Sequence, residues 1–405
     1  MENLQWLDEE DDWQVLMKFL PAGWQAEAKE LGALKRCRKF AGAEVLLRIL
    51  LIHLAGGCSL RETVVRAKQG NIAAISDVAL LKRLRASGEW FRWMTVGVME
   101  QWIEKQPAAI FGRGCRIRVI DGSTIQEPGA TGSTWRIHYS IGLPSLQCDE
   151  VYVTSPKTGE SFQQFTVNPG DLFLGDRNFG RRPDIRHVVQ EGGQVLVRIN
   201  LTNLPLVGKD GSSFRLLDHL KMLKKTELGD WDVWVPYEDV FLAGRVCALK
   251  KSKEVAEKAR LKTLRENGKK GHAVKPETLE AAGYTFVFTT LPRTFSAETA
   301  LEMYRGRWQI EIAFKRLKSI IGLGHLRKTD VEGAKAWLHG KLLVAFLMEA
   351  LVAAGERFFP WGYPLSPEWP PKVPLPMEGE LTDASPAELH GKPNASSWFV
   401  SPKLA

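Results

Sequence analysis

The stretch "CRIRVIDGS", residues 115–123, decides the fold because the sequence changes there from a helical to a strand pattern. Cys115, Ile117 and Val119 alternate with two arginines, which is typical of a strand with one buried face. An acidic residue, Asp121, and a glycine follow directly. The chain from about residue 109 onward is therefore expected to form a β-sheet.

Further strands and one helix are predicted downstream. The strand patterns are "TWRIHYSIGL", "EVYVTS", "DLFLGD" and "QVLVRIN". Before the last of them, "RRPDIRHVVQEGG" is typical of a helix, with Pro183 near its first turn and Gly192 past its end. Strands followed by a helix and another strand predict an α/β fold, a mixed sheet with flanking helices.

Residues 1–108 are predicted to be helical. "SLRETVVRAK" places Ser59 three positions before Glu62, a capping-box pattern, and "SDVALLKRLRASG" carries leucines beside Lys and Arg. Short helices with basic faces fit a helix-turn-helix-like DNA reader. They also fit a plain helical bundle, which this region favours when it is taken alone.

The second half of the chain is expected to interrupt the sheet and then resume it. Residues 201–283 combine strand-like segments with a dense basic helix and are predicted to be an insertion with its own β structure. "YTFVFTTLP" resumes the main sheet, and the chain becomes Pro-rich after about residue 355, which disfavours packed helices and central strands. The expected units are a helical N-terminal region (1–108), the first part of the core (109–200), a β-rich insertion (201–283), the second part of the core (284–355) and a tail (356–405).

The composition restricts the class of partner and compartment. The chain has 405 residues, a formal net charge of +8 and a pI near 9.1, which favours a polyanionic partner. Its five cysteines include no C-x-x-C pair, so reduced thiols in a cytoplasm are expected. The acidic start is unlike a signal peptide. The most apolar runs are shorter than the roughly 20 residues of a membrane span, so no membrane association is expected.

The segment "YRGRWQIEIAFKRLK", residues 304–318, is predicted to be a helix that holds one acidic residue among cations. At 100° per residue, four side chains form one polar stripe: Tyr304, Arg307, Glu311 and Lys318. At about 1.5 Å per residue the stripe is roughly 20 Å long, which suits a phosphate backbone better than a small molecule. The alternative is an exposed helix face with salt-bridged charges.

Two further carboxylates are predicted at strand ends. Asp121 follows "RIRVI" and Asp176 follows "LFLG", although each position also fits ordinary turn chemistry. Together with Glu311 they offer hard oxygen ligands and no soft ones, which suits Mg²⁺ or Mn²⁺ better than zinc. Two such ions about 4 Å apart activate a water on one side of a phosphodiester and stabilise the leaving oxygen on the other.

These residues resemble the DDE transposases of bacterial insertion sequences, specifically the type-four insertion-sequence family with its Y-R-E-K signature. The likeness rests on "VIDGST", "LGDRNFG" and the spacing Tyr304–x2–Arg307–x3–Glu311–x6–Lys318, and it covers roughly residues 35–350. It implies a ribonuclease H-like fold and an enzyme that cuts and pastes DNA. The short, Pro-rich tail departs from relatives with a long helical dimerisation domain, so the mode of pairing stays open.

The resemblance also assigns roles by position. It implies a catalytic, metal-binding triad of Asp121, Asp176 and Glu311 with two Mg²⁺ or Mn²⁺ ions. It implies phosphate contacts at the transposon end from the remaining signature residues: Tyr304, Arg307 and Lys318. Two more DNA contacts are candidates with open alternatives: Arg177, which contacts phosphate or pairs with a carboxylate, and Trp308, which stacks on a base or packs in the protein.

The implied partners are double-stranded DNA, both as terminal inverted repeats and as target, and a second copy of the chain in a synaptic homodimer. The N-terminal region and the insertion would bind the repeats, and the protein would be cytoplasmic and associated with the bacterial nucleoid. Two other functions remain open. One is another ribonuclease H-like, metal-dependent DNA nuclease, and the other is a non-catalytic, transposase-derived DNA-binding regulator.

Overall fold

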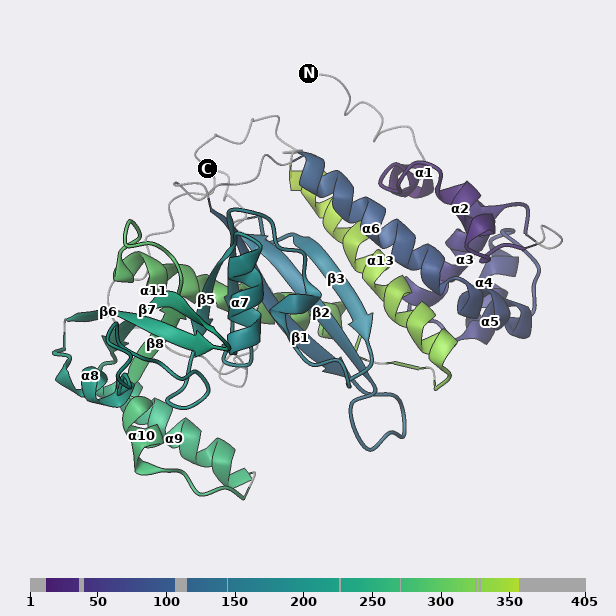
Figure 1. The fold of residues 1–405 in the computed structure, drawn as a ribbon. Coiled ribbons are helices and arrows are strands. Elements are labelled where there is room, and N and C mark those ends of the chain that lie inside the picture. Colours follow the sequence, from purple (N-terminus) through teal and green to yellow (C-terminus); the bar gives the residue numbers. More distant parts are fainter. Residues whose placement is uncertain are drawn as a thin grey trace, which may run out of the picture.

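The computed structural model describes residues 12–35, 40–105, 115–143, 145–225, 227–269, 271–324, 326–327 and 329–356. The acidic start, Cys37 and the Pro-rich segment 357–405 lie outside the described residues, and the expectations for them stay predictions. Figure 1 shows a central sheet with helices on both faces and a helical group beside one edge.

One eight-stranded mixed sheet organises the described chain, in the order β3-β2-β1-β4-β5-β8-β7-β6 (Figure 1). Its strands are β1 (Arg116–Ile125), β2 (Trp135–Leu143), β3 (Cys148–Thr154), β4 (Asp171–Gly175), β5 (Gln194–Arg198), β6 (Leu228–Tyr237), β7 (Val240–Lys250) and β8 (Tyr284–Thr289). β1 pairs antiparallel with β2 and parallel with β4, which in turn pairs parallel with β5. The expected α/β, ribonuclease H-like fold is confirmed.

The strands expected in a separate insertion belong to this same sheet. β6 and β7 form an antiparallel hairpin, β7 pairs with β8, and β8 pairs with β5. The expectation that residues 201–283 have a β structure of their own is therefore wrong. A strand pattern records which face of a strand is buried but not which strand it pairs with, so the sequence could not show this.

Helices surround the sheet. Those before it are α1 (Asp12–Met17), α2 (Trp24–Glu30), α3 (Ala43–Ala55), α4 (Leu60–Gln69), α5 (Asp77–Ala86) and α6 (Gly88–Lys105). Those within or after it are η2 (Phe162–Gln164), α7 (Arg182–Gln190), α8 (Leu216–Met222), α9 (Lys253–Lys269), α10 (Pro276–Ala281), α11 (Ala297–Arg305), η3 (Gly306–Trp308), α12 (Gln309–Lys315), η4 (Arg316–Ile320) and α13 (Val331–Glu356). The predicted cap at Ser59 is confirmed, because its hydroxyl accepts the Glu62 N–H at 3.1 Å.

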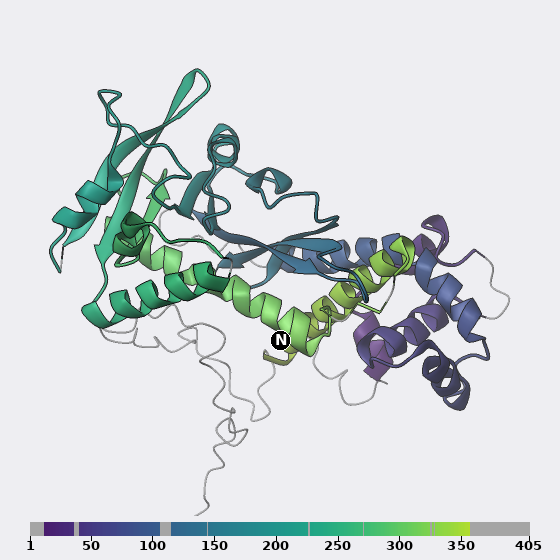
Figure 2. The same cartoon turned by 90° about the horizontal axis from the view of Figure 1, so that it is seen from below.

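Alternation along the strands separates two apolar cores, one on each face of the sheet. On β1, Val119 belongs to the core that contains α11, α12 and α13, whereas Ile120 belongs to the core that contains α7 and α8. Figure 2 shows the α11–α12 segment running along one face while α7 lies on the other. The first core continues into the N-terminal helices through α6 and α13, so residues 12–105 do not form a bundle with a core of its own.

The helix α13 is longer than the apolar run in the sequence indicated. Val331–Ala354 is long and apolar enough to cross a membrane, but 72% of its most apolar window is buried inside the protein. It packs against α3, α5 and α6 (Figure 1). The expectation that no apolar segment reaches membrane length is corrected, and the burial identifies α13 as a core helix.

A buried arginine joins three strands at one end of the sheet. Arg118 on β1 is 2% exposed. Its guanidinium contacts Asp149 at 2.8 Å and Glu150 at 2.6 Å on β3, and Asp171 at 3.4 Å on β4. Burial alone would lower the pKa of Arg118, but these three acids raise it above its ordinary value, so the side chain stays charged.

Replacing Arg118 should strongly destabilise the protein. Arg118→Met would leave Asp149 and Glu150 without their cation and Asp171 with Arg116 alone, which lies 2.6 Å away. Breaking such a buried cluster costs about 3–5 kcal/mol. Arg293→Met is the matched control, because the Arg293 side chain is 56% exposed and pairs with Asp232 at 2.8 Å; it should cost at most about 1 kcal/mol. Urea unfolding measures both, and equal costs would contradict the role assigned to Arg118.

Candidate functional site

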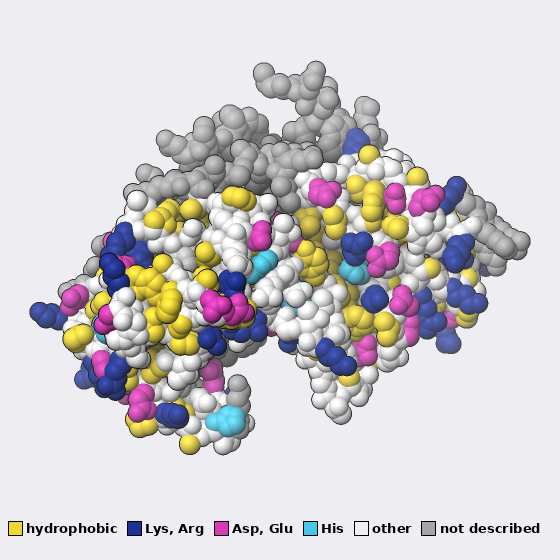
Figure 3. Space-filling view, in the orientation of Figure 1, with side chains coloured by type: hydrophobic (Ala, Val, Ile, Leu, Met, Phe, Trp, Pro, Cys, Tyr) yellow, Lys and Arg dark blue, Asp and Glu magenta, His cyan; other side chains and the backbone are white. Residues whose placement is uncertain are grey.

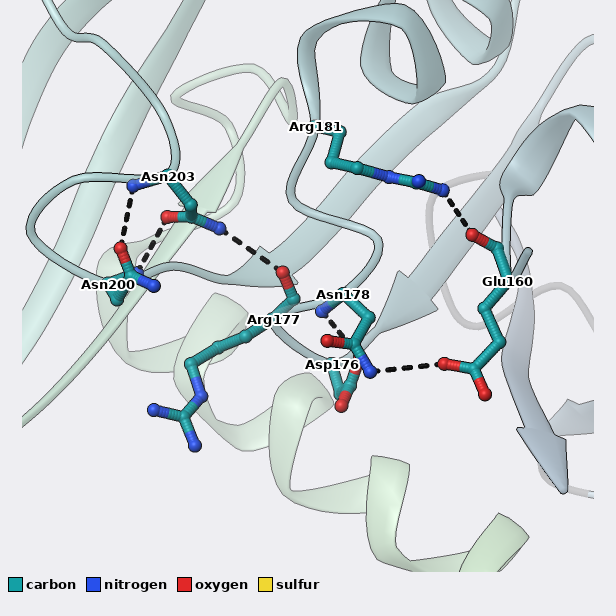
Figure 4. Close-up of a pocket in the computed structure, with 7 residues that line it drawn as sticks. All are labelled: Glu160, Asp176, Arg177, Asn178, Arg181, Asn200 and Asn203. Carbon is teal, nitrogen blue, oxygen red and sulfur yellow. Dashed lines mark hydrogen bonds between the residues drawn. The ribbon is translucent and has the colours of Figure 1, made fainter. Parts of the chain in front are cut away.

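A polar hollow of about 640 Å³ lies beyond the carboxyl end of β4 (Figure 4). It is lined by Glu160, Asp176, Arg177, Asn178, Arg181, Asn200 and Asn203. In sheets with parallel strands, ligands bind outside the carboxyl ends of those strands. The hollow therefore lies where this architecture places a reactive site.

The strand register brings Asp121 and Asp176 together. Val119 on β1 lies beside Leu174 on the parallel strand β4, so two residues further along both strands Asp121 comes beside Asp176. Adjacent strands are about 4.8 Å apart. Asp176 follows the last residue of β4, as predicted, but Asp121 lies inside β1, which continues to Ile125. The expectation that Asp121 ends its strand is wrong, because antiparallel pairing with β2 extends β1 beyond it.

The Asp121 carboxyl group is electrostatically strained. Its pKa is raised from 3.8 to about 7, and burial is the largest cause. The negative charges of Asp176 and Glu160 also raise this pKa, whereas a hydrogen bond from the Gly122 N–H at 2.7 Å and the nearby Arg307 cation lower it. The carboxyl group therefore holds its proton more tightly than an ordinary aspartate does. It sits where an additional positive charge would be strongly favoured.

Glu311 is connected to the surroundings of Asp121 through the Arg307 cation. Its carboxylate, half exposed, accepts a hydrogen bond from Arg307 Nη2 at 2.6 Å. Burial would lower the pKa of Arg307, but Tyr304, Glu311 and Asp121 raise it above its ordinary value. Arg307 thus lies within electrostatic reach of Asp121 while it holds Glu311.

The segment that carries Glu311 is irregular, although the sequence predicted a regular helix over residues 304–318. A 3₁₀ segment, η3, interrupts it at Gly306–Trp308, and a π-helical segment, η4, ends it at Arg316–Ile320. Both depart from 100° per residue, so the stripe of four polar side chains is not straight. Within η4, Lys318 turns to β1, where its Nζ donates to the Thr124 carbonyl oxygen at 3.1 Å.

Close packing against the sheet explains why a glycine, Gly306, stands in this helix. A Cβ at Gly306 would lie 2.8 Å from Leu143 Cδ1 on β2. The absent side chain therefore lets the helix approach the sheet closely at the point where it changes to 3₁₀ geometry. An approach to DNA is not needed to explain this glycine.

The remaining predicted DNA contacts differ in their surroundings. The Arg307 guanidinium lies 5.9 Å from the centre of the Tyr304 ring, so these two residues belong to one group. Trp308 is 51% exposed, so a purely internal packing role does not account for it. Arg177 is exposed, and its side chain points away from Asp176 and Glu160 (Figure 4).

Comparison with known proteins connects this site to a family. Residues 156–347 match the family described as "Transposase DDE domain". The chain is 34% identical over 362 residues to the transposase for insertion sequence element IS421 of Escherichia coli, covering 86% of this chain and 96% of that protein. It has the same identity and coverage over 361 residues with InsL of the element IS186A of E. coli strain K12.

The chain belongs to the DDE transposases of insertion sequences. A more distant relative, the transposase for element IS231F of Bacillus thuringiensis subsp. israelensis, is 24% identical over 389 residues, or 85% of this chain and 80% of that protein. As a bacterial insertion-sequence transposase, the protein is an enzyme that acts on DNA. Its domain type implies dependence on divalent metal ions in general.

The acidic residues of the transposase fit a hard divalent cation by their donor chemistry. Asp121 and Asp176 offer carboxylate oxygens from adjacent strands, and a cation would relieve the repulsion that raises the pKa of Asp121. Among the residues that the structure describes, no three His, Cys, Asp or Glu side chains are grouped closely enough to hold an ion together. Glu311 is bound to Arg307 in this conformation.

Glu160 also lies at this site of the transposase, although the sequence did not predict it there. Its side chain is 18% exposed and lies close enough to Asp121 to raise the pKa of that residue. Glu160 is in the loop between β3 and η2, where "KTGES" has the composition of an ordinary turn. No spacing or periodicity in the sequence distinguishes it from other surface glutamates.

The raised pKa of Asp121 predicts a pH-dependent gain of stability in the Asp121→Asn protein. Because the folded state binds this proton more tightly than the unfolded state does, ionised Asp121 lowers stability progressively as the pH rises from about 4 to 7. The asparagine variant lacks this penalty. Its stability advantage should therefore grow by roughly 1–2 kcal/mol from pH 5 to pH 8, after allowance for solvent screening.

Thermal unfolding in the presence of EDTA at both pH values tests this expectation without metal ions. Glu191→Gln, at an exposed position after α7, should show no growing difference. An Asp121→Asn advantage that is the same at pH 5 and pH 8 would show that Asp121 titrates normally.

Proposed function

We propose that this transposase excises and inserts its element by a cut-and-paste route: hydrolysis of the phosphodiester at each transposon end, then strand transfer to target DNA. Asp121, Asp176 and Glu311 are the proposed catalytic residues. The observation that supports this assignment is the register of β1 and β4, which continued by two residues brings Asp121 beside Asp176. Arg307, which holds Glu311, lies within electrostatic reach of Asp121.

The proposed cofactor is Mg²⁺ or Mn²⁺, held as two ions by the three acids. When bound, such ions activate the attacking oxygen and stabilise the leaving one. Glu311 has to leave Arg307 before it can serve as a ligand. An incoming DNA phosphate offers Arg307 another anionic partner, so substrate binding would release the Glu311 carboxylate.

The proposed DNA contacts follow the type-four subfamily with the Y-R-E-K signature. Arg307 and Lys318 lie on either side of Glu311 along the chain, and each is within electrostatic reach of Asp121. These cations offset the repulsion between an acidic site and a polyanionic substrate. Tyr304 lies against Arg307, while Arg177 and Trp308 are exposed contacts farther along the proposed DNA path.

Binding of the terminal inverted repeats is assigned to the N-terminal helices and to α9, within the proposed units 1–108 and 201–283. Lys and Arg side chains gather over the N-terminal helices and over α8–α10 (Figure 3). Two copies of the chain would pair the two ends of the element in a synaptic homodimer. The working location would be the cytoplasm, at the bacterial nucleoid.

Neutral substitutions of the three acids should abolish cleavage but not DNA binding. Even second-layer partners of a metal site contribute 10–100-fold, so Asp121→Asn, Asp176→Asn and Glu311→Gln should each reduce end cleavage with Mg²⁺ by more than about 100-fold. Gel electrophoresis of labelled transposon-end DNA measures cleavage, and Glu191→Gln is the control. Full activity in any of the three variants would exclude that residue as catalytic.

Precut transposon ends separate the proposed function from its nuclease alternative. A transposase should join the free 3′ ends to target DNA, and the joined product should be lost in the same three variants. Cleavage of uncut ends without any joined product would instead identify a nuclease.

Removing the cations should weaken binding of transposon-end DNA. Arg307→Ala and Lys318→Ala should each cost roughly 1–3 kcal/mol of binding free energy if the charges contact phosphate, and each should lower the salt dependence of binding by about one ion. Gel-shift titrations at several salt concentrations measure both quantities. Lys335→Ala, on exposed α13 surface, is the control, and equal affinities for all three variants would contradict the assigned role.

A further inference from the structure

We propose that Glu160 is a positioning residue of the transposase site, which fastens the turn that carries Asp176 to the strand that carries Asp121. This inference rests on the proposed role of those two aspartates. Glu160 belongs to neither strand, and it contacts a neighbour of each aspartate.

The first contact is with β1. A Cβ built at Gly122, the residue after Asp121, would lie 2.6 Å from Cγ and 2.7 Å from Oε1 of Glu160. The Glu160 side chain therefore packs directly on the backbone of β1, in space that only a glycine leaves free. The same Gly122 donates its N–H to the Asp121 carboxylate at 2.7 Å, so Glu160 lies against the residue that orients Asp121.

The second contact is with the turn after β4. Asn178 Nδ2 donates to Glu160 Oε2 at 3.1 Å, and the Asn178 backbone N–H donates to Asp176 Oδ1 at 2.7 Å. Figure 4 shows these two hydrogen bonds in series, from Glu160 through Asn178 to Asp176. One carboxylate therefore connects the two aspartates through their neighbours.

Glu160 is itself held in place at its backbone. Its backbone carbonyl oxygen accepts from Arg181, whose Nε donates to the buried Asp184 at 2.7 Å. Arg136 Nε lies 3.9 Å from Glu160 Oε1 and has no hydrogen-bond partner among the described residues. Arg136 partly balances the charge of Glu160 without taking it away from Asn178.

A fastening of this kind is needed because Asp121 and Asp176 repel each other. Without metal ions, like charges on neighbouring strands favour a turn that swings outward, and the turn after β4 is exposed at Arg177 and Asn178. Residues that hold metal ligands in orientation typically change metal affinity or activity 10–100-fold when they are removed. Glu160 acts in this way through Asn178 and Gly122.

The test compares four variants by Mn²⁺ binding to metal-free, full-length protein, measured by isothermal titration calorimetry. Glu160→Ala and Asn178→Ala should each weaken Mn²⁺ binding by about 10-fold or more. The double variant should be no weaker than the worse single variant, because both act through one hydrogen bond. Glu160→Gln should stay within about threefold of the unsubstituted protein, because its amide oxygen still accepts from Asn178.

The cleavage reaction supplies a second readout. The Mg²⁺ concentration for half-maximal cleavage of transposon ends should rise in Glu160→Ala and Asn178→Ala, while binding of end DNA stays unchanged. Glu191→Ala is the matched control at an exposed glutamate and should change neither quantity.

Several results would overturn the inference. Additive losses in the double variant, or a Glu160→Gln loss as large as that of Glu160→Ala, would show that Glu160 does not act through the Asn178 hydrogen bond. The Asp121→Asn variant distinguishes a failure of the role proposed for Glu160 from a failure of the proposed function. If it loses Mn²⁺ binding while Glu160→Ala does not, only the role of Glu160 fails; if it binds Mn²⁺ normally, the proposed function fails. Should Glu160→Ala not fold, Asn178→Ala and Glu160→Gln decide the question alone.

Discussion

The buried charge of Arg118 is the constraint on which the site depends. Its three acidic partners come from β3 and from the first residue of β4, so the ion cluster ties together β3, β1 and β4, with β2 between them. A buried cation with three carboxylates tolerates little displacement, because any lost contact leaves a charge in a poorly solvating interior. The cluster, together with the Arg116–Asp171 pair at 2.6 Å, holds β4 against β1, and the parallel register of these strands sets Asp176 beside Asp121 at their far end.

The site itself holds opposite charges in balance. Asp121, Asp176 and Glu160 gather negative charge, and the irregular helix opposite them supplies positive charge from Arg307 and Lys318. The 3₁₀ and π-helical segments matter here because a uniform helix would direct those two side chains differently. The proposed binding of a polyanion and a divalent cation at one place requires such a surface, because each alone would be repelled by part of it.

The sequence predicted the elements better than their connections. Alternating residues identified β1, and other strand-like segments identified β2 to β5. Two aspartates after strand patterns, together with the fixed spacing of Tyr304, Arg307, Glu311 and Lys318, identified the family. The joining of β6 and β7 to the same sheet was not predictable, because burial patterns do not specify a pairing partner. The shift of Lys318 toward Thr124 depends on a π-helical turn that 100° periodicity cannot represent. Glu160 escaped detection because its role comes from Gly122 and Asn178, which are brought near it only by folding.

The position of α13 has a practical consequence for dividing the protein. This helix follows the last core segment in the chain, yet it packs between the sheet and α3, α5 and α6. A fragment that begins after residue 105 would uncover an apolar rod of 26 residues, and such a surface promotes aggregation or insertion into lipid. The N-terminal helices and the core that carries the acidic residues therefore have to be expressed together, and recombination between relatives within this region would be poorly tolerated.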